Sequence, residues 1–342
     1  MDTLPAKILY LLKQGEMKPG TLSKKLSISR QALHSHLRVL VASKSVQKHG
    51  AGPHVVYSAM PDSSSSSRAP KDYKFCLQQL LPRYRRKFSL DLERHMRGIL
   101  QHKSMKGRFD LSFLLDSAAV YSSNIEGNTL DLNSFLNSRM SPKKHRPKEA
   151  QEIEDLVLTY EYARKSELSE KHMLHAHRML SRQFVAASRQ GVYRQERVGV
   201  FSRCGLVYMA VEPHLVPREM QALFSIISKL LKKRHSPTES FFWATWLHLM
   251  IAFIHPFSDG NGRAARLCEK WFLATMLGEQ SFAIPSEELY WKNRPRYYAA
   301  LQLGANYWET NMSKAFPFFA LLPQALLKGS REEIFIQGKE NI

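Results

Sequence analysis

The spacing of apolar residues predicts helices through most of residues 71–342. Residues 242–254 and residues 264–275 are each so apolar at helical spacing that both helices should be buried. Between them lies a dense polar segment, from His255 to Arg266. We therefore expect a helix–loop–helix unit in which two buried helices hold a chemically active loop.

The first 60 residues predict a separate module. Apolar spacing indicates helices over residues 4–12, 21–26 and 29–41, with Ser29 as a suitable N-cap, and then strands at 46–49 and 54–57 around a turn at 50–53. This order resembles the winged helix-turn-helix domain over about residues 3–60. The resemblance implies that the third helix enters a DNA major groove, with four outward-facing candidates for DNA contact: Arg30, Gln31, His34 and Arg38. A module for protein contacts is the alternative.

Charge supports a polyanionic partner without proving one. The net charge is +20, and residues 1–60 hold nine Lys or Arg against two acids.

A serine-rich stretch at 61–70 predicts a linker to a second domain at 71–342. Residues 1–25 contain no long apolar core, and no later apolar run has membrane-spanning length. The three cysteines are odd in number and widely spaced, which fits reduced thiols better than a disulfide framework or a zinc site: Cys76, Cys204 and Cys268. We expect a cytoplasmic protein without a membrane partner.

Two further patterns concern residues outside the central loop. Residues 197–211 predict a β-hairpin whose exposed edges could accept an extended peptide. Residues 170–181 predict a helix that carries His172, His175 and His177. Because no acid or cysteine stands at matching spacing, we expect packing and surface roles for these histidines rather than a metal site.

The end of a predicted helix near 111–127 contains a misplaced charge. Gly127 suits a C-cap, but Glu126 puts a carboxylate at the negative end of the helix dipole, at a cost of up to about 1 kcal/mol. A nearby cation would explain this acid.

The loop itself has the composition of an anion site. Gly260 and Gly262 free backbone amides at the positive end of the next helix. Arg263 and Arg266 stand where the dipole disfavours cations, so a bound polyphosphate would explain both. In isolation, the Asp-Gly and Asn-Gly pairs are also ordinary turn dipeptides.

The remaining polar residues of the loop suit phosphoryl chemistry. Asp259 could hold Mg²⁺ that bridges phosphate oxygens, and Asn261 could donate to the same phosphates. His255 is the one group in the loop that titrates near neutral pH, so it could take a proton from an attacking hydroxyl.

The segment from His255 to Arg266 resembles the signature of the Fic family at every defined position, and the resemblance extends over roughly residues 109–303. It implies a mainly α fold, a Fic-type helical bundle with a β-hairpin flap. It also implies transfer of AMP from ATP·Mg²⁺ to a hydroxyl side chain of a target protein, with release of pyrophosphate.

Carried over by position, the resemblance makes His255 the base, Asp259 the Mg²⁺ ligand and Phe257 a core anchor. The implied phosphate contacts are Gly260, Asn261, Gly262, Arg263 and Arg266, and the implied target-docking flap is Val198, Gly199, Val200 and Phe201.

The segment at 122–127 resembles the inhibitory motif of the same family, with Ser122, Glu126 and Gly127 at its defined positions. The resemblance implies that Glu126 pairs with Arg266 and blocks productive ATP binding. Removal of AMP from a modified protein stays open, as does a DNA-binding regulator whose Fic domain only senses nucleotide. The sequence also leaves a homo-oligomer open.

Overall fold

The chain divides into two compact units, Met1–Ser66 and Ser67–Ile342. The computed structural model describes residues 4–13, 15–42, 45–50, 52, 55–59, 68–101, 111–142, 145–202 and 205–327. Most of the predicted linker at 61–70 therefore lies outside the described residues. Its last three residues are already helical, because α4 (Arg68–Phe75) begins at Arg68 and Pro70 falls in its first turn, where proline is tolerated.

The first unit contains three helices followed by a hairpin. The elements are α1 (Leu4–Lys13), α2 (Pro19–Leu26), α3 (Arg30–Ala42), β1 (Val46–His49) and β2 (Val56–Ala59). The Ser29 hydroxyl accepts from the Ala32 amide at 3.2 Å, which confirms the predicted N-cap. The hydrophobic core of the first unit includes Ile8, Leu22, Leu37 and Tyr57. The second strand starts two residues later than predicted.

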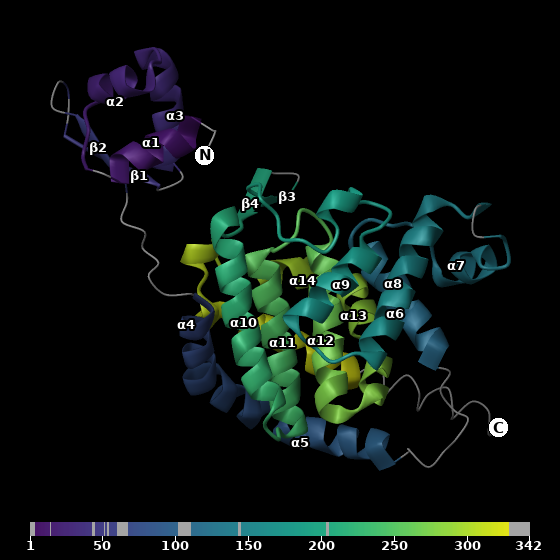
Figure 1. The fold of residues 1–342 in the computed structure, drawn as a ribbon. Helices are drawn as coiled ribbons and strands as arrows, with labels where there is room; N and C mark the ends of the chain where they lie inside the picture. The colour runs from purple at the N-terminus through teal and green to yellow at the C-terminus, as the bar shows by residue number, and fades with distance from the viewer. Residues whose placement is uncertain are drawn as a thin grey trace. The chain divides into compact units, whose positions relative to one another are not determined.

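The second unit is a helical bundle (Figure 1). A π-helical turn at Cys76–Leu80 joins α4 to the next helix. The remaining helices are α5 (Leu81–Gln101), α6 (Leu111–Ile125), α7 (Leu132–Ser138), α8 (Lys148–Lys165), α9 (Glu170–Leu180), α10 (Val216–Leu231), α11 (Pro237–Ile254), α12 (Asn261–Leu277), α13 (Ser286–Lys292), α14 (Arg294–Leu301) and α15 (Phe316–Phe319).

Helices α11 and α12 form the centre of this bundle, as the apolar pattern predicts. Nearly every residue of α11 is buried, and the indole rings of Trp243, Trp246 and Trp271 lie in the core. The helix starts at Pro237, earlier than the apolar run, because Ser236 and Glu239 form a reciprocal capping box ahead of it. This rigid pair fixes both ends of the loop at 255–260.

The predicted hairpin consists of antiparallel β3 (Gly199–Ser202) and β4 (Gly205–Met209) at one end of the bundle (Figure 1). Its edges are not both open, because the Met209 amide donates to the Ala305 carbonyl at 2.9 Å. Cys76 and Cys268 are free buried thiols, whereas Cys204 lies outside the described residues. Among the described helices, none has the length and apolar character needed to cross a bilayer.

Candidate functional site

The site begins where α11 ends. His255 adopts a left-handed conformation (φ 52°, ψ 59°), which is uncommon for a residue other than glycine, asparagine or aspartate. Pro256 disfavours a helical conformation at the residue before it, so the helix stops at Ile254. His255 therefore turns the chain out of α11 and into the loop.

Arg194 holds this turn in place from the segment that leads into β3. Its guanidinium donates to the carbonyl oxygens of His255 (2.6 Å), Glu196 (2.8 Å) and Val211 (2.6 Å). Its own amide donates to the Pro256 carbonyl at 3.0 Å. Arg194 is buried, and it ties the base of the hairpin to the strained residue of the loop.

The His255 ring is arranged as a proton acceptor. Its Nδ1 lies 3.1 Å from the Ala252 carbonyl and must therefore donate, which leaves the lone pair on Nε2. Burial lowers the pKa of His255, and the nearby Arg194 charge acts in the same direction. The neutral base form thus prevails at physiological pH.

Asn261 closes the loop on itself. Its side-chain oxygen accepts from the Phe257 amide and its side-chain nitrogen donates to the Phe257 carbonyl, both at 2.8 Å. The Asn261 side chain is buried and braces the loop, and its contact with phosphate stays a prediction. Phe257 is fully buried, as a core anchor should be.

The amides after Asp259 form a cradle at the start of α12. Gly260 has φ +81°, a conformation that favours glycine. A Cβ atom at Gly262 would collide with the Glu126 carboxylate, so this acid lies directly against the backbone of the cradle. The predicted anion site therefore holds an anionic side chain of the chain itself.

Arg266 is the partner of that acid. Its Nη2 donates to Glu126 Oε1 at 2.7 Å and to the Ser122 carbonyl at 2.9 Å, and its Nε donates to the Ser122 hydroxyl at 2.9 Å. The Arg266 side chain is 1% exposed and that of Glu126 is 30% exposed. Although burial acts to raise the pKa of Glu126, the charges of Arg266 and Arg263 hold it below its usual value.

Arg263 pairs with a second acid, which the sequence did not indicate. Its Nη2 contacts Glu152 Oε1 at 2.5 Å, and its guanidinium lies 4.3 Å from the centre of the Phe184 ring. Burial raises the pKa of Glu152 in spite of this pairing. The buried Nε of Arg263 has no hydrogen-bond acceptor among the described residues. An orphaned donor of this kind fits an incoming phosphate oxygen.

Asp259 is exposed, and its Oδ1 accepts from the Gly260 amide at 2.6 Å. Within the described ranges, no group of three His, Cys, Asp or Glu residues is arranged to hold a metal ion. Any Mg²⁺ at this position would thus depend on one carboxylate together with phosphate oxygens, a common arrangement for this ion.

Three residues of the site were missed at the sequence level: Arg194, Glu152 and His177. His177 donates from Nε2 to the Asp259 carbonyl at 2.9 Å, although we expected it to be a packing or surface residue. No spacing pattern could have identified these residues, because each comes from an element far from the loop in sequence.

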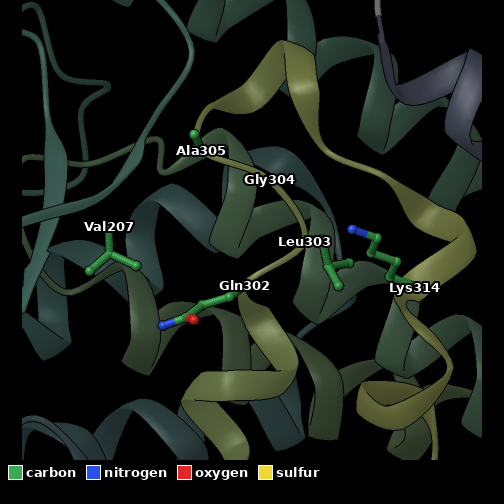
Figure 2. A pocket seen from close by; sticks show the side chains of 6 residues that line it. All are labelled: Val207, Gln302, Leu303, Gly304, Ala305 and Lys314. Atoms are coloured by element: carbon green, nitrogen blue, oxygen red, sulfur yellow. The ribbon is translucent and has the colours of Figure 1, made fainter.

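The four predicted flap residues lie at the start of the hairpin. Val198 precedes β3, and Gly199, Val200 and Phe201 lie within it. A cavity of about 320 Å³ beside β4 is lined by Val207, Gln302, Leu303, Gly304, Ala305 and Lys314 (Figure 2). None of these residues belongs to the segment from His255 to Arg266, where Glu126 lies against Gly262.

In the first unit, the four candidates for DNA contact are all exposed on α3: Arg30, Gln31, His34 and Arg38. Arg30 and His34 also line a cavity of about 550 Å³. Three lysines, Lys18, Lys24 and Lys25, line the same cavity and make it strongly basic.

Comparison with known proteins matches two parts of the chain to protein families. Residues 167–273 match the Fic/DOC family, and residues 6–44 match the bacterial regulatory proteins of the arsR family. The chain is 29% identical over 192 residues to the protein adenylyltransferase Fic of Drosophila persimilis, an alignment that covers 54% of this chain and 35% of the relative. The chain thus spans about a third of the length of such relatives.

Two solved structures share the fold. A Fic family protein from Desulfovibrio desulfuricans superposes with a TM-score of 0.59 at 24% identity, covering 72% of this chain and 74% of that one. A Fic domain containing signaling protein from Bacteroides thetaiotaomicron gives 0.53 at 20% identity, covering 69% and 92%. The chain therefore contains a helical domain of the Fic/DOC family, preceded by an arsR-type helix-turn-helix region.

Proposed function

We propose that this protein is an adenylyltransferase that moves AMP from ATP to a Ser, Thr or Tyr hydroxyl of a target protein. The hydroxyl oxygen bonds to the α-phosphorus, the bond from that phosphorus to the bridging oxygen breaks, and pyrophosphate leaves. His255 Nε2 takes the hydroxyl proton. The relatives named as adenylyltransferases support this reaction.

The observation that carries the proposal is the position of Glu126. Its carboxylate lies against the Gly262 backbone and on the Arg266 guanidinium, where a polyphosphate would need both groups. A carboxylate in this position mimics part of the substrate charge. We infer that Glu126 inhibits transfer by competing for Arg266, and that Ser122 and Gly127 hold it there.

The residues also fit ATP·Mg²⁺. The orphaned Arg263 Nε and the Cβ-free cradle at Gly262 offer contacts for phosphate oxygens, and the exposed Asp259 would hold the metal. When bound, Mg²⁺ would neutralise charge on the phosphates. The arginines and the amides of α12 would position the same groups, and positioning is the main contribution in phosphoryl transfer.

The first prediction tests the inhibitory role. Glu126→Gly should raise transfer of labelled AMP to the protein or to a partner in lysate by about tenfold or more, because even about 1.4 kcal/mol of competition corresponds to a factor of ten. Mass spectrometry would identify the AMP adduct. Glu167→Gly, at an exposed loop residue between α8 and α9, is the matched control and should leave labelling unchanged. Equal or weaker labelling by Glu126→Gly would contradict the proposal.

Removal of AMP from a modified protein would use the same residues, with Glu126 orienting water. Incubating the wild type and Glu126→Gly with an AMP-modified protein separates the two directions. Release of AMP by the wild type alone would favour hydrolysis as the physiological reaction.

The basic cavity favours a second function, DNA binding by the first unit. Lys18, Lys24 and Lys25 would contact phosphates while residues of α3 read bases. Gel-shift assays against genomic fragments, with and without ATP, test this function and show whether nucleotide binding changes it. Unaltered mobility of every fragment at low salt would remove the DNA role.

A further inference from the structure

His177 connects two parts of the catalytic domain. The Gly191 amide donates to His177 Nδ1 at 3.0 Å, and the Asp259 carbonyl lies 2.9 Å from His177 Nε2. An amide N–H requires a lone pair on Nδ1, and a carbonyl oxygen requires a proton on Nε2. The two partners therefore fix a neutral ring in the Nε2–H tautomer.

The surroundings of the ring hold it in this orientation. His177 is 0% exposed and stacks on Phe257, with ring centres 3.6 Å apart and an angle of 4° between the planes. Burial lowers the pKa of His177 to about 4, in agreement with a neutral ring. A Cβ atom at Gly260 would lie 3.3 Å from His177 Nε2, so the ring also packs closely under the cradle.

We propose that His177 is a positioning residue for the loop, whose Nε2–H fixes the Asp259 carbonyl and thereby sets the Asp259 carboxylate and the cradle amides for metal-bound phosphate. The inference deepens the proposed function and depends on it for the identity of the ligand. Partners that orient a metal ligand are typically worth about 10–100-fold in metal affinity or activity.

Two substitutions separate positioning from packing. His177→Phe keeps a ring on Phe257 but loses both hydrogen bonds, whereas His177→Gln loses the stacking ring but places an amide N–H about where Nε2 lies. Both variants are compared in the Glu126→Gly background. We expect His177→Phe to raise the MgCl₂ concentration needed for half-maximal ATP binding about tenfold more than His177→Gln does. Binding of a fluorescent ATP analogue during MgCl₂ titration measures this difference.

A readout without nucleotide keeps the inference independent of the proposed reaction. Hydrogen exchange at the Gly260, Asn261 and Gly262 amides should rise more in His177→Phe than in His177→Gln. His175→Phe, at an exposed position on the same helix, is the control and should change neither measurement.

The inference would be overturned if His177→Gln had the larger effect on these measurements, or if the two variants had equal effects. Ring packing alone would then explain the role of His177. If the Glu126→Gly parent binds no ATP, the proposed function fails. The exchange experiment still decides whether His177 positions the loop.

Discussion

At the residue scale, the site is organised by paired charges. Arg266 and Arg263 are both nearly buried, and an unpaired buried charge is costly. The counter-charges come from Glu126, in the turn directly after α6, and from Glu152 in α8. The two carboxylates therefore make the buried arginines compatible with folding. A polyphosphate could replace the carboxylates without leaving a guanidinium unpaired, but it would first have to displace them.

His255 should be needed for chemistry and dispensable for nucleotide binding. Replacing it by alanine in the Glu126→Gly background removes the lone pair of Nε2 but leaves the cradle and both arginines. We expect AMP transfer to fall at least about 100-fold, the usual contribution of a general base, while the dissociation constant for ATP changes less than about threefold. Single-turnover transfer and equilibrium binding measure the two effects. Retained transfer would remove His255 as the base.

The value of kcat/KM for AMP transfer should fall on the acid side of its pH profile. The neutral form of His255 is active, and its pKa lies below the ordinary value of 6.5 because burial and Arg194 disfavour the cation. The charge of Glu126 acts to raise this pKa, so removing Glu126 should lower the pKa of His255 further. For Glu126→Gly, kcat/KM should therefore fall only below pH 6.5 and stay level from pH 6.5 to 8. A limb centred above pH 6.5 would contradict this assignment.

At the element scale, the decisive contact is between the base of the hairpin and the end of α11. Arg194 reaches the carbonyls of His255, Val211 and Glu196 at once, so one side chain joins the hairpin, the loop and the helix end. Such a clamp lets a non-glycine residue keep a left-handed conformation, which costs of order 1–3 kcal/mol.

Replacing Arg194 by methionine should break this clamp. The carbonyl groups it binds would lose their donors inside the protein, so we expect the free energy of unfolding to fall by about 2–4 kcal/mol. Transfer by the Glu126→Gly parent should fall as well, because the turn at His255 would no longer be held in the left-handed conformation that positions its ring. Urea denaturation measures the stability change. Arg197→Met, at an exposed position on the same segment, should change it by less than about 0.5 kcal/mol.

At the scale of the whole molecule, the two units have separate hydrophobic cores. A unit with its own core can fold independently. The Fic-type site lies entirely in the second unit, and the basic cavity lies entirely in the first. Reaction and DNA binding are therefore expected to be separable properties of one chain.

Deleting residues 1–66 should accordingly leave both the fold of the second unit and the transfer activity of Glu126→Gly unchanged within about twofold, while it abolishes any DNA gel shift. Thermal unfolding, AMP labelling and gel shift on the same preparation measure these properties. A large loss of labelling in a folded truncated protein would show that the first unit contributes to catalysis.

The sequence determined much of this protein by itself. The apolar pattern identified α11 and α12, because α11 is an almost continuous apolar run and apolar residues recur at helical spacing along α12. The segment from His255 to Arg266 could be interpreted locally, because glycines, a helix start and arginines at short spacing act together. Even Glu126 was marked, by its unfavourable position at a helix end.

Only the tertiary structure decided what these residues contact. Asn261 makes hydrogen bonds with the Phe257 backbone, and Arg263 contacts Glu152 across 111 positions of sequence. His177 and Arg194 also reach the loop from distant elements. The physical reason is that a local pattern records which face of an element is buried, whereas the partner of a buried polar group is set by how separate elements pack together.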